Sequence, residues 1–428
     1  MLSMRWPRRA AAVVAVSAVL VAPAPAQAAA CQTEPARASV FKGTPAEDAV
    51  YAPQRLAPLA TGKGIRVAVI DSGVDPTHPQ LQGQVLTGAD FLRNDPNGRQ
   101  DCIGHGTAVA SLIAATPAGD TGFQGLAPGA RIVPIRISEQ TEDAEGNTSG
   151  DPGSPARFAA AIDFAVRRAH VQVINLSLVM TRENELVDAA VRRALEAGVV
   201  VVAAAGNHGK DGEDVPTWPA AVPGVIAVAA VGPDGTRAEF SQRGAFLSIS
   251  AYGVNVTVAN RGAGNLTDQG TSFSAPFVSA TAALLLERFP GIGPGEVRRR
   301  LQATADPAPG GPKEYGAGLL NPYRALTESL GPASRAPVAP QVMHPNDPAA
   351  VALAERREQS RQMALWFAAA GAALVLLLAA AALIVRRGRS RGWRPADPVG
   401  SPRPVEGGGP ARAVDSGGVL RPIDAGRR

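Results

Sequence analysis

The feature of this sequence that most limits its fold is the alternation of short strand patterns with amphipathic helical patterns between residues 61 and 330. The strand patterns are runs of β-branched and apolar residues, which are typical of strands buried on both faces. They lie at 65–70, 131–137, 171–178, 199–204 and 225–231. Alternating strands and helices predict an α/β fold, a doubly wound parallel sheet with helices on both faces. Active sites of such sheets lie at the carboxyl ends of the strands.

The segments between the predicted strands contain two predicted helices and one polar insertion. Residues 158–169 and 183–197 place apolar side chains at helical spacing, and Gly198 is a stop signal after the second. Residues 138–155 are rich in Glu, Asp, Gly and Ser and predict an exposed insertion loop. Such a loop is either simply solvated or a partner-binding or self-cleaved segment.

The first 28 residues have the pattern of a cleaved secretory signal. Three arginines precede an apolar run from Ala10 to Ala22, and the small-residue sequence Ala26-Gln27-Ala28 follows. An N-terminal membrane anchor would need about 20 apolar residues, and this run is shorter. We therefore expect a signal peptide at 1–28 and an exported mature chain.

An uncharged apolar stretch predicts a C-terminal transmembrane helix at 362–385. It is long enough to cross a hydrocarbon core about 30 Å thick, whereas a core helix of a globular protein is rarely so long and uncharged. Arginines follow at once, so the basic, disordered tail at 386–428 is expected in the cytoplasm. A Pro- and Ala-rich spacer with a charged juxtamembrane segment occupies 331–361. The predicted location is the cell membrane, single-pass type I, with the globular part outside.

The charge of the chain does not indicate a nucleic-acid partner. The formal net charge is +5. The basic excess lies in the predicted signal and in the tail, where ten arginines accompany four acidic residues. The rest of the chain has a slight acidic excess, so a basic binding face is not expected there.

Cys31 and Cys102 are the two cysteines of the chain. An even number in an exported protein predicts that they form a disulfide. That bridge would close a loop of about 70 residues and contribute roughly 4 kcal/mol in the chain-entropy model. Lipidation of Cys31 is the competing interpretation, but Ala28-Ala29-Ala30 is a poor lipidation signal and a second anchor would be redundant.

Three reactive side chains stand beside glycines at the edges of predicted elements. Asp71 ends the first strand, His105 opens a helical run, and Ser272 lies at the N-terminus of the helix that runs to Arg288. A serine hydroxyl becomes nucleophilic when a histidine takes its proton and a carboxylate orients the imidazole. Asp71, His105 and Ser272 are therefore the candidate catalytic residues. Asn207 and the backbone N–H of Ser272 are the candidate donors to an oxyanion.

Four motifs of this chain resemble the subtilase family, and the resemblance covers residues 64 to about 326. The motifs are Asp71-Ser-Gly73, Gly104-His-Gly-Thr107, Ala205-Gly-Asn207 and Gly270-Thr-Ser-Phe-Ser-Ala-Pro276. The order Asp, His, Ser, with an Asn between the last two, is also that of subtilisin. The resemblance implies a subtilisin-like α/β domain that hydrolyses peptide bonds without a cofactor, with Asn207 in the oxyanion hole.

The resemblance also implies a substrate-binding edge strand. Ser177, Leu178 and Val179 would pair with an extended substrate, and Gly206 is a further candidate contact. The family usually has Gly-Gly after the Leu, whereas this chain has Val179-Met180, which is expected to narrow the primary specificity pocket. No acidic cluster has the spacing of a calcium loop, so we predict no structural metal.

The wider architecture resembles the mycosins, subtilases associated with type VII secretion in actinobacteria. A short extension at 29–60 precedes the peptidase domain at 61–330, followed by the spacer, the single span and the tail. The resemblance implies limited proteolysis of exported proteins beside a type VII secretion membrane complex. The alternatives are a mainly structural subunit of that complex with secondary proteolysis, a general degradative protease, and an inactive binding protein.

The role of the extension follows from the expected disulfide. Cys102 lies three residues before His105, so a bridge to Cys31 would fasten the extension close to the catalytic cleft. We therefore expect a permanent wrap rather than an inhibitor. The alternative is that residues 51–59 cover the site as a prosegment would.

Overall fold

The computed structural model describes residues 31, 37–142, 148–209 and 214–331. The predicted signal, spacer, transmembrane helix and tail lie outside the described residues, apart from residue 331. Within the described part of the chain, no helix combines the length and apolarity needed to cross a bilayer.

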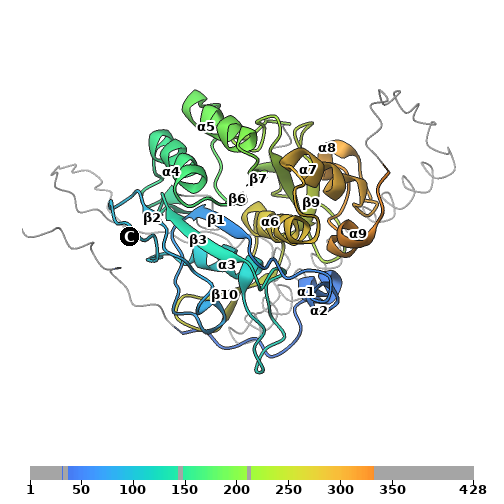
Figure 1. The fold of residues 1–428 in the computed structure, drawn as a ribbon, viewed down its shortest axis with the longest axis horizontal. Helices are drawn as coiled ribbons and strands as arrows, with labels where there is room; N and C mark the ends of the chain where they lie inside the picture. The colour runs from blue at the N-terminus through green and yellow to red at the C-terminus, as the bar shows by residue number, and fades with distance from the viewer. Residues whose placement is uncertain (1–30, 32–36, 143–147, 210–213, 332–428) are drawn as a thin grey trace, which may run out of the picture. The chain divides into compact units, whose positions relative to one another are not determined.

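A seven-stranded sheet forms the centre of the fold (Figure 1), and its neighbouring strands are all parallel. The strand order is β2-β3-β1-β6-β7-β8-β9. The strands are β1 Arg66–Asp71, β2 Ala89–Asp90, β3 Arg131–Arg136, β6 Val173–Leu176, β7 Val200–Ala204, β8 Ile226–Val231 and β9 Ile249–Tyr252. The order reverses at β1, so the carboxyl end of β1 lies at the switch point where open α/β sheets bind ligands.

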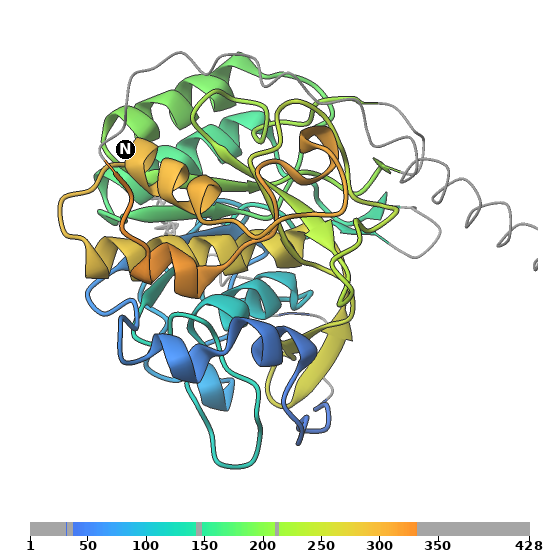
Figure 2. The same cartoon turned by 90° about the vertical axis from the view of Figure 1, so that its right-hand side faces the viewer.

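Helices cover both faces of the sheet, as the sequence predicts (Figures 1 and 2). Val67 and Val69 of β1 pack in the core beneath α3 and α6, whereas Ala68 and Ile70 pack in the core beneath α4 and α5. This alternation follows from the twofold period of a strand. The four helices are α3 His105–Ala114, α4 Pro155–Arg167, α5 Glu185–Glu196 and α6 Thr271–Arg288.

Smaller elements surround this core. β10 and β11 form an antiparallel hairpin whose second strand leads into α6. These elements are α1 Ala46–Tyr51, α2 Pro53–Leu56, η1 Pro79–Leu81, β4 Thr141–Glu142, β5 Thr148–Ser149, β10 Val256–Ala259, β11 Asn265–Asp268, α7 Pro294–Ala303, α8 Pro312–Tyr315 and α9 Pro322–Thr327. The predicted insertion loop carries the β4–β5 pair. It is not exposed throughout, because Ser138 is buried and Glu139 forms ion pairs with Arg93 and Arg136.

The described part of the N-terminal extension begins against the β10–β11 hairpin. Ala38 donates its N–H to the carbonyl of Ala263 at 3.2 Å, and Asn265 donates its N–H to the carbonyl of Ser39 at 3.0 Å. The side chain of Asn265 accepts the N–H of Phe41 at 3.0 Å. The extension therefore runs beside the turn of the hairpin.

Further along, the extension enters the core through α1 and α2. Tyr51 and Leu56 are 4 % and 0 % exposed and lie in the same core as α3 and α6. The ring of Tyr51 packs against Phe277 of α6, with 5.0 Å between ring centres, and its hydroxyl accepts the N–H of Tyr252 at 3.0 Å. Residues 46–60 are thus an integral part of the folded domain, which is what a permanent wrap requires.

Truncation of Leu56 tests this packing. Leu56→Ala leaves a cavity in the shared core and is expected to lower the free energy of unfolding by about 2–5 kcal/mol. Val50 lies in the same extension but is 59 % exposed, so Val50→Ala should change the free energy by less than about 0.5 kcal/mol. Chemical denaturation of the purified full chain, followed by tryptophan fluorescence, measures both. Equal midpoints for the two variants would contradict the packing.

Candidate active site

Asp71 and His105 meet at the carboxyl edge of the sheet. Asp71 is the last residue of β1, and His105 is the first residue of α3. Nδ1 of His105 lies 2.7 Å from Oδ1 of Asp71, and the same oxygen accepts the N–H of Ser72 at 2.7 Å. The Asp71 side chain is 1 % exposed and that of His105 is 28 % exposed. A carboxylate at Nδ1 favours the tautomer in which Nε2 is free to accept a proton.

Helix α3 can approach β1 this closely because residue 106 is glycine. A Cβ atom at Gly106 would lie 2.0 Å from the carbonyl oxygen of Gly73 and 3.2 Å from Cβ of Asp71. Any side chain there would collide with the backbone and separate the helix from the strand. The glycine after His105 therefore keeps the imidazole within reach of the carboxylate.

A second buried carboxylate, Asp101, joins the end of β1 to the start of α3. Its Oδ1 accepts the hydroxyl of Ser72 at 2.9 Å and the N–H of Gly104 at 2.7 Å. Its Oδ2 accepts the N–H and the hydroxyl of Thr107 at 2.9 and 2.6 Å. Sequence reasoning missed Asp101. Its only signal was an acidic residue just ahead of a predicted helix, where carboxylates satisfy the free N–H groups of the first turn.

The charges around His105 raise its pKa to about 9. Burial of the ring opposes protonation, but the charge of Asp71 and the hydrogen bond to it outweigh burial, and the charges of Asp268 and Asp101 add to their effect. The contact with Asp71 therefore favours the protonated imidazole.

Ser272 lies in the first turn of α6, where a proline changes the usual bonding. Pro276 has no N–H and cannot donate to the carbonyl of Ser272 four residues earlier. The hydroxyl of Ser177 donates to that carbonyl instead, at 2.8 Å. In return the hydroxyl of Ser272 donates to the carbonyl of Ser177 at 3.0 Å. Ser177, which sequence analysis assigned to substrate binding, thus also holds the hydroxyl and the backbone carbonyl of Ser272.

A buried polar chain fixes Ser177 in this position. Nδ2 of Asn175 donates to the hydroxyl of Ser177 at 2.9 Å, and the hydroxyl of Ser279 donates to Oδ1 of Asn175 at 2.8 Å. Asn175, Ser177 and Ser279 are all buried. Because Ser279 lies in the third turn of α6, these hydrogen bonds tie the first and third turns of that helix to the end of β6.

Asn207 is held beside Ser272 with its amide oriented. Its Oδ1 accepts both the N–H and the hydroxyl of Thr271, each at 2.9 Å. Nδ2 therefore faces away from Thr271 and lies near Gly270, where a Cβ atom would be 3.4 Å from it. Gly270 has a φ of +148°, a conformation that is essentially restricted to glycine. Thr271 thus engages Oδ1 of Asn207, and Nδ2 is the part of the amide that remains to act as a donor beside α6.

The other predicted substrate-binding residues lie around this group. The N–H of Gly206 donates to the hydroxyl of Thr271 at 3.0 Å, so Gly206 fixes the loop that carries Asn207. Leu178 and Val179 follow the end of β6, partly buried, and pack against the cores on opposite faces of the sheet. Thr271, which links Gly206 to Asn207, was not singled out from the sequence.

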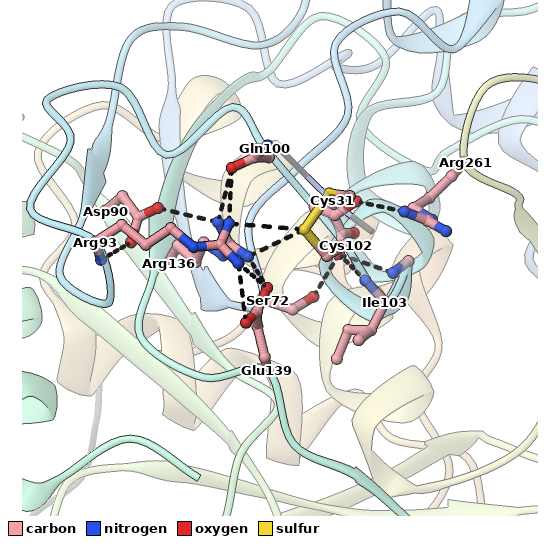
Figure 3. Close-up of a disulfide and its surroundings, with 12 residues drawn as sticks. Cys31, Ser72, Asp90, Arg93, Gln100, Cys102, Ile103, Arg136, Glu139 and Arg261 are labelled. Atoms are coloured by element: carbon pink, nitrogen blue, oxygen red, sulfur yellow. Dashed lines mark hydrogen bonds and ion pairs between the residues drawn. A yellow bond between two sulfur atoms is a disulfide. The ribbon is translucent and has the colours of Figure 1, made fainter. Parts of the chain in front are cut away.

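The structure contains the disulfide expected between Cys31 and Cys102. The S–S distance is 2.10 Å and the Cα–Cα distance is 5.2 Å. Because Cys102 follows Asp101 directly, the bridge attaches the start of the described extension to the segment that positions His105 (Figure 3).

Comparison with known proteins identifies the family. Residues 62–318 match the subtilase family, peptidase S8. The chain belongs to this family of serine endopeptidases. A solved structure of MycP1 from Mycobacterium smegmatis is 31% identical with a TM-score of 0.60, and the match covers 74% of this chain and 93% of MycP1. A structure of the MycP3 protease from the type VII (ESX-3) secretion system is 30% identical with a TM-score of 0.58, and the match covers 71% of this chain and 95% of MycP3.

Curated relatives include both mycosins and subtilisins. Mycosin-1 of Mycobacterium tuberculosis is 33% identical over 323 residues, which cover 64% of this chain and 72% of mycosin-1. Subtilisin E of Bacillus subtilis is 36% identical over 262 residues, which cover 61% of this chain and 65% of subtilisin E. The chain thus spans about two thirds of the length of these relatives. This subtilase is a subtilisin-like serine protease related to the mycosins of type VII secretion.

The Asp71–His105 interaction predicts the titration of the imidazole. NMR of ring-labelled histidine in the full chain should give His105 a pKa of about 9, and Asp71→Asn should lower it markedly because the main charge that favours protonation is lost.

The same interaction predicts how stability depends on pH. A raised pKa of His105 adds to the free energy of unfolding; this contribution is fully present below pH 6.5 and is lost as the pH rises through 9. Asp71→Asn should therefore destabilise the protein more at pH 6 than at pH 10. Asp163→Asn, at a distant ion pair, is the control, and an unchanged His105 titration in Asp71→Asn would refute the interaction.

The contacts of Ser177 predict a loss of stability on truncation. Ser177→Ala leaves the carbonyl of Ser272 and the amide of Asn175 without this partner, which should lower the free energy of unfolding by about 1–3 kcal/mol. Ser39 is exposed, so Ser39→Ala is the matched control. Chemical denaturation of both variants provides the measurement. Identical stability of Ser177→Ala and the parent chain would show that the buried polar chain does not hold Ser272.

Proposed function

We propose that this subtilase is a membrane-anchored endopeptidase that cleaves exported proteins with a triad of Asp71, His105 and Ser272. The observation that carries the catalytic assignment is the 2.7 Å contact between the buried carboxylate of Asp71 and the accessible imidazole of His105. The Ser177 contacts that fix Ser272 at the start of α6 support its role as nucleophile.

The acylation step begins with a change of partner at Ser272. Its hydroxyl leaves the carbonyl of Ser177 and donates to Nε2 of His105, which takes the proton as Oγ attacks the scissile carbonyl carbon. Asp71 keeps the proton of Nδ1 in place and stabilises the imidazolium. His105 then gives its proton to the departing amine. Water next attacks the acyl-enzyme, with His105 taking a proton from the water and returning one to Oγ of Ser272.

The oxyanion of the tetrahedral intermediate would be bound by two donors. One is Nδ2 of Asn207, which the two hydrogen bonds from Thr271 orient. The other is the backbone N–H of Ser272 in the first turn of α6, where the helix dipole also favours negative charge. Both donors are fixed before substrate arrives, so little reorganisation is needed when the charge develops.

The substrate would bind as an extended strand along Ser177, Leu178 and Val179. The branched side chain of Val179, in place of the glycine usual in the family, should restrict the primary specificity pocket. Contact between this segment and the substrate also offers a route to free the Ser272 hydroxyl, because the hydroxyl is bound to the carbonyl of Ser177. Few substrates, rather than general degradation, are expected.

The proposed location rests on the two chain ends. The signal pattern at 1–28 directs export, and the uncharged stretch at 362–385, followed by arginines, predicts a helix with its tail in the cytoplasm. The peptidase domain would then face the outside of the cytoplasmic membrane. Relatedness to mycosin-1 and to the MycP3 protease supports a link to type VII secretion and its membrane complex.

A mainly structural role is the second candidate function. One observation favours it: a similar structure, MycP1, is described as an essential component of the type VII (ESX-1) secretion system. In that case the chain would act as a subunit of the membrane complex, and proteolysis would be secondary.

Substitutions at the proposed triad and oxyanion hole separate these functions. In the purified full chain, Ser272→Ala should lower kcat for a fluorogenic peptide by about 10⁶-fold, and Asn207→Ala by about 10²–10³-fold. In cells, Ser272→Ala separates the two functions if it stops substrate cleavage while secretion continues. That result would show that secretion depends on the chain as a structural subunit, and that cleavage depends on the triad.

Ser274→Ala is the matched control for these measurements. Ser274 lies two residues beyond Ser272 in the same helix, and within the described part of the chain its buried hydroxyl has no hydrogen-bond partner. Its removal should leave kcat nearly unchanged. Peptide hydrolysis by Ser272→Ala at the rate of the Ser274→Ala control would rule out the proposed nucleophile.

A further inference from the structure

The two sulfur atoms of the disulfide have different surroundings. Nη2 of Arg136 donates to Sγ of Cys102 at 3.3 Å, and Nη1 of Arg93 donates to the same atom at 3.7 Å. Within the described part of the chain, both hydrogen bonds to the disulfide end on Cys102 and none ends on Cys31. Figure 3 shows the two guanidinium groups side by side against this sulfur.

The sheet holds Arg136 in this position. It is the last residue of β3, and its register places it between Asp71 of β1 and Asp90 of β2. Its side chain is 0 % exposed and pairs with Asp90 at 3.1 Å. A fully buried guanidinium held by strand register is a fixed donor, unlike a surface arginine that must lose side-chain entropy to make the same contact.

Carboxylates also face this group, and they partly offset its positive charge. Glu139 pairs with both Arg93 and Arg136, and Asp90 pairs with Arg136. Asp101 precedes Cys102 in the sequence, but it forms no ion pair with these arginines in the described residues. Its oxygens accept hydrogen bonds from Ser72, Gly104 and Thr107.

Arg261 is a further cation beside this segment, and it donates to the carbonyl of Asp101 at 3.1 Å. The two groups that touch the sulfur of Cys102 directly are both cationic donors. They would stabilise a thiolate there more than the carboxylates behind them destabilise it.

We propose that the Cys31–Cys102 bridge is an exchangeable disulfide in which a low-molecular-weight thiol attacks Sγ of Cys31 and Cys102 leaves as a thiolate held by Arg93 and Arg136. Exchange is fastest when the departing sulfur is the better-stabilised thiolate. Both cysteines are partly exposed, so a small thiol can reach the bond. The structure thus assigns Cys31 as a site of reversible S-thiolation.

The exchange step balances without a further oxidant. The attacking thiolate forms a new S–S bond with Cys31, and the electron pair of the broken bond goes to Sγ of Cys102. The product is a mixed disulfide on Cys31 and a thiolate on Cys102. Return attack by that thiolate on Cys31 restores the bridge and releases the small thiol.

The extension is expected to stay folded after this step. Its backbone contacts to Ala263 and Asn265 and the burial of Tyr51 and Leu56 do not involve the disulfide. The chain segments therefore remain close, which makes the exchange reversible. It introduces a negative charge three residues before His105.

Mapping of the modified cysteine tests the proposal. The full chain carrying Ser272→Ala, which prevents self-digestion, is incubated briefly with reduced glutathione and quenched with N-ethylmaleimide. Peptide mass analysis should find glutathione on Cys31 and maleimide on Cys102. Glutathione on Cys102, equal labelling of both cysteines, or no exchange in the folded protein would overturn it. Because the readout is labelling, its failure is separate from any failure of the proposed proteolysis.

Variants of one loop test the role of the arginines. Arg93→Gln should slow exchange by roughly threefold or more, because the leaving thiolate loses a donor. Arg99→Gln removes an equal charge from an exposed position of the same loop and should leave the rate unchanged. Equal rates for Arg93→Gln and the parent, or equal slowing by Arg99→Gln, would refute the assignment.

A direct titration provides an independent measurement. In Cys31→Ser the thiol of Cys102 is the sole thiol of the full chain, and the pH dependence of its alkylation by iodoacetamide gives its pKa. The value should lie below the usual value of about 8.5 for a free cysteine, and Arg93→Gln should raise it. A pKa of about 8.5 or higher in Cys31→Ser would overturn the proposal. If Cys31→Ser does not fold, the glutathione mapping decides.

Discussion

The arrangement of the site depends on one buried carboxylate that takes no part in the proposed chemistry. Asp101 binds Ser72, which follows Asp71, and the first turn of α3, which carries His105. A carboxylate removed from water is costly unless donors surround it, and these contacts compensate that cost only in one arrangement of strand and helix. Burial nevertheless raises its pKa. The distance between Asp71 and His105 is therefore set by a neighbour rather than by their own attraction alone.

A similar indirect control acts on Ser272. Because Pro276 removes a bond inside α6, the carbonyl of Ser272 is held by Ser177 at the end of β6. The segment proposed to bind substrate is thus the one that holds the proposed nucleophile. Substrate binding at the end of β6 is therefore expected to affect the hydrogen bond that holds the hydroxyl of Ser272. Both sides of the site are supported by side chains that do not themselves react.

Much of the fold and of the candidate site could be predicted because the informative patterns are local. Strand β1 was expected at 65–70 and runs from Arg66 to Asp71, and glycine-flanked motifs located Asp71 and His105. Buried polar groups were missed, because their partners lie far away in the sequence. Glu47 has the appearance of a surface residue but is 1 % exposed and accepts the N–H of Thr257, 210 residues later. Arg136 is fully buried for a similar reason, since it pairs with Asp90, which lies 46 residues earlier.

The pairing of Ala38 and Ser39 with the β10–β11 hairpin has a consequence for association between molecules. Strand edges with free N–H and C=O groups are templates for pairing with other chains, and folded proteins usually cover or interrupt them. The extension occupies the backbone groups of Ala263 and Asn265 beside Leu266, whose side chain is 51 % exposed. A molecule that lacked the extension would present an open, partly apolar strand edge. The extension therefore covers an edge that could pair with other chains, as well as adding to the core.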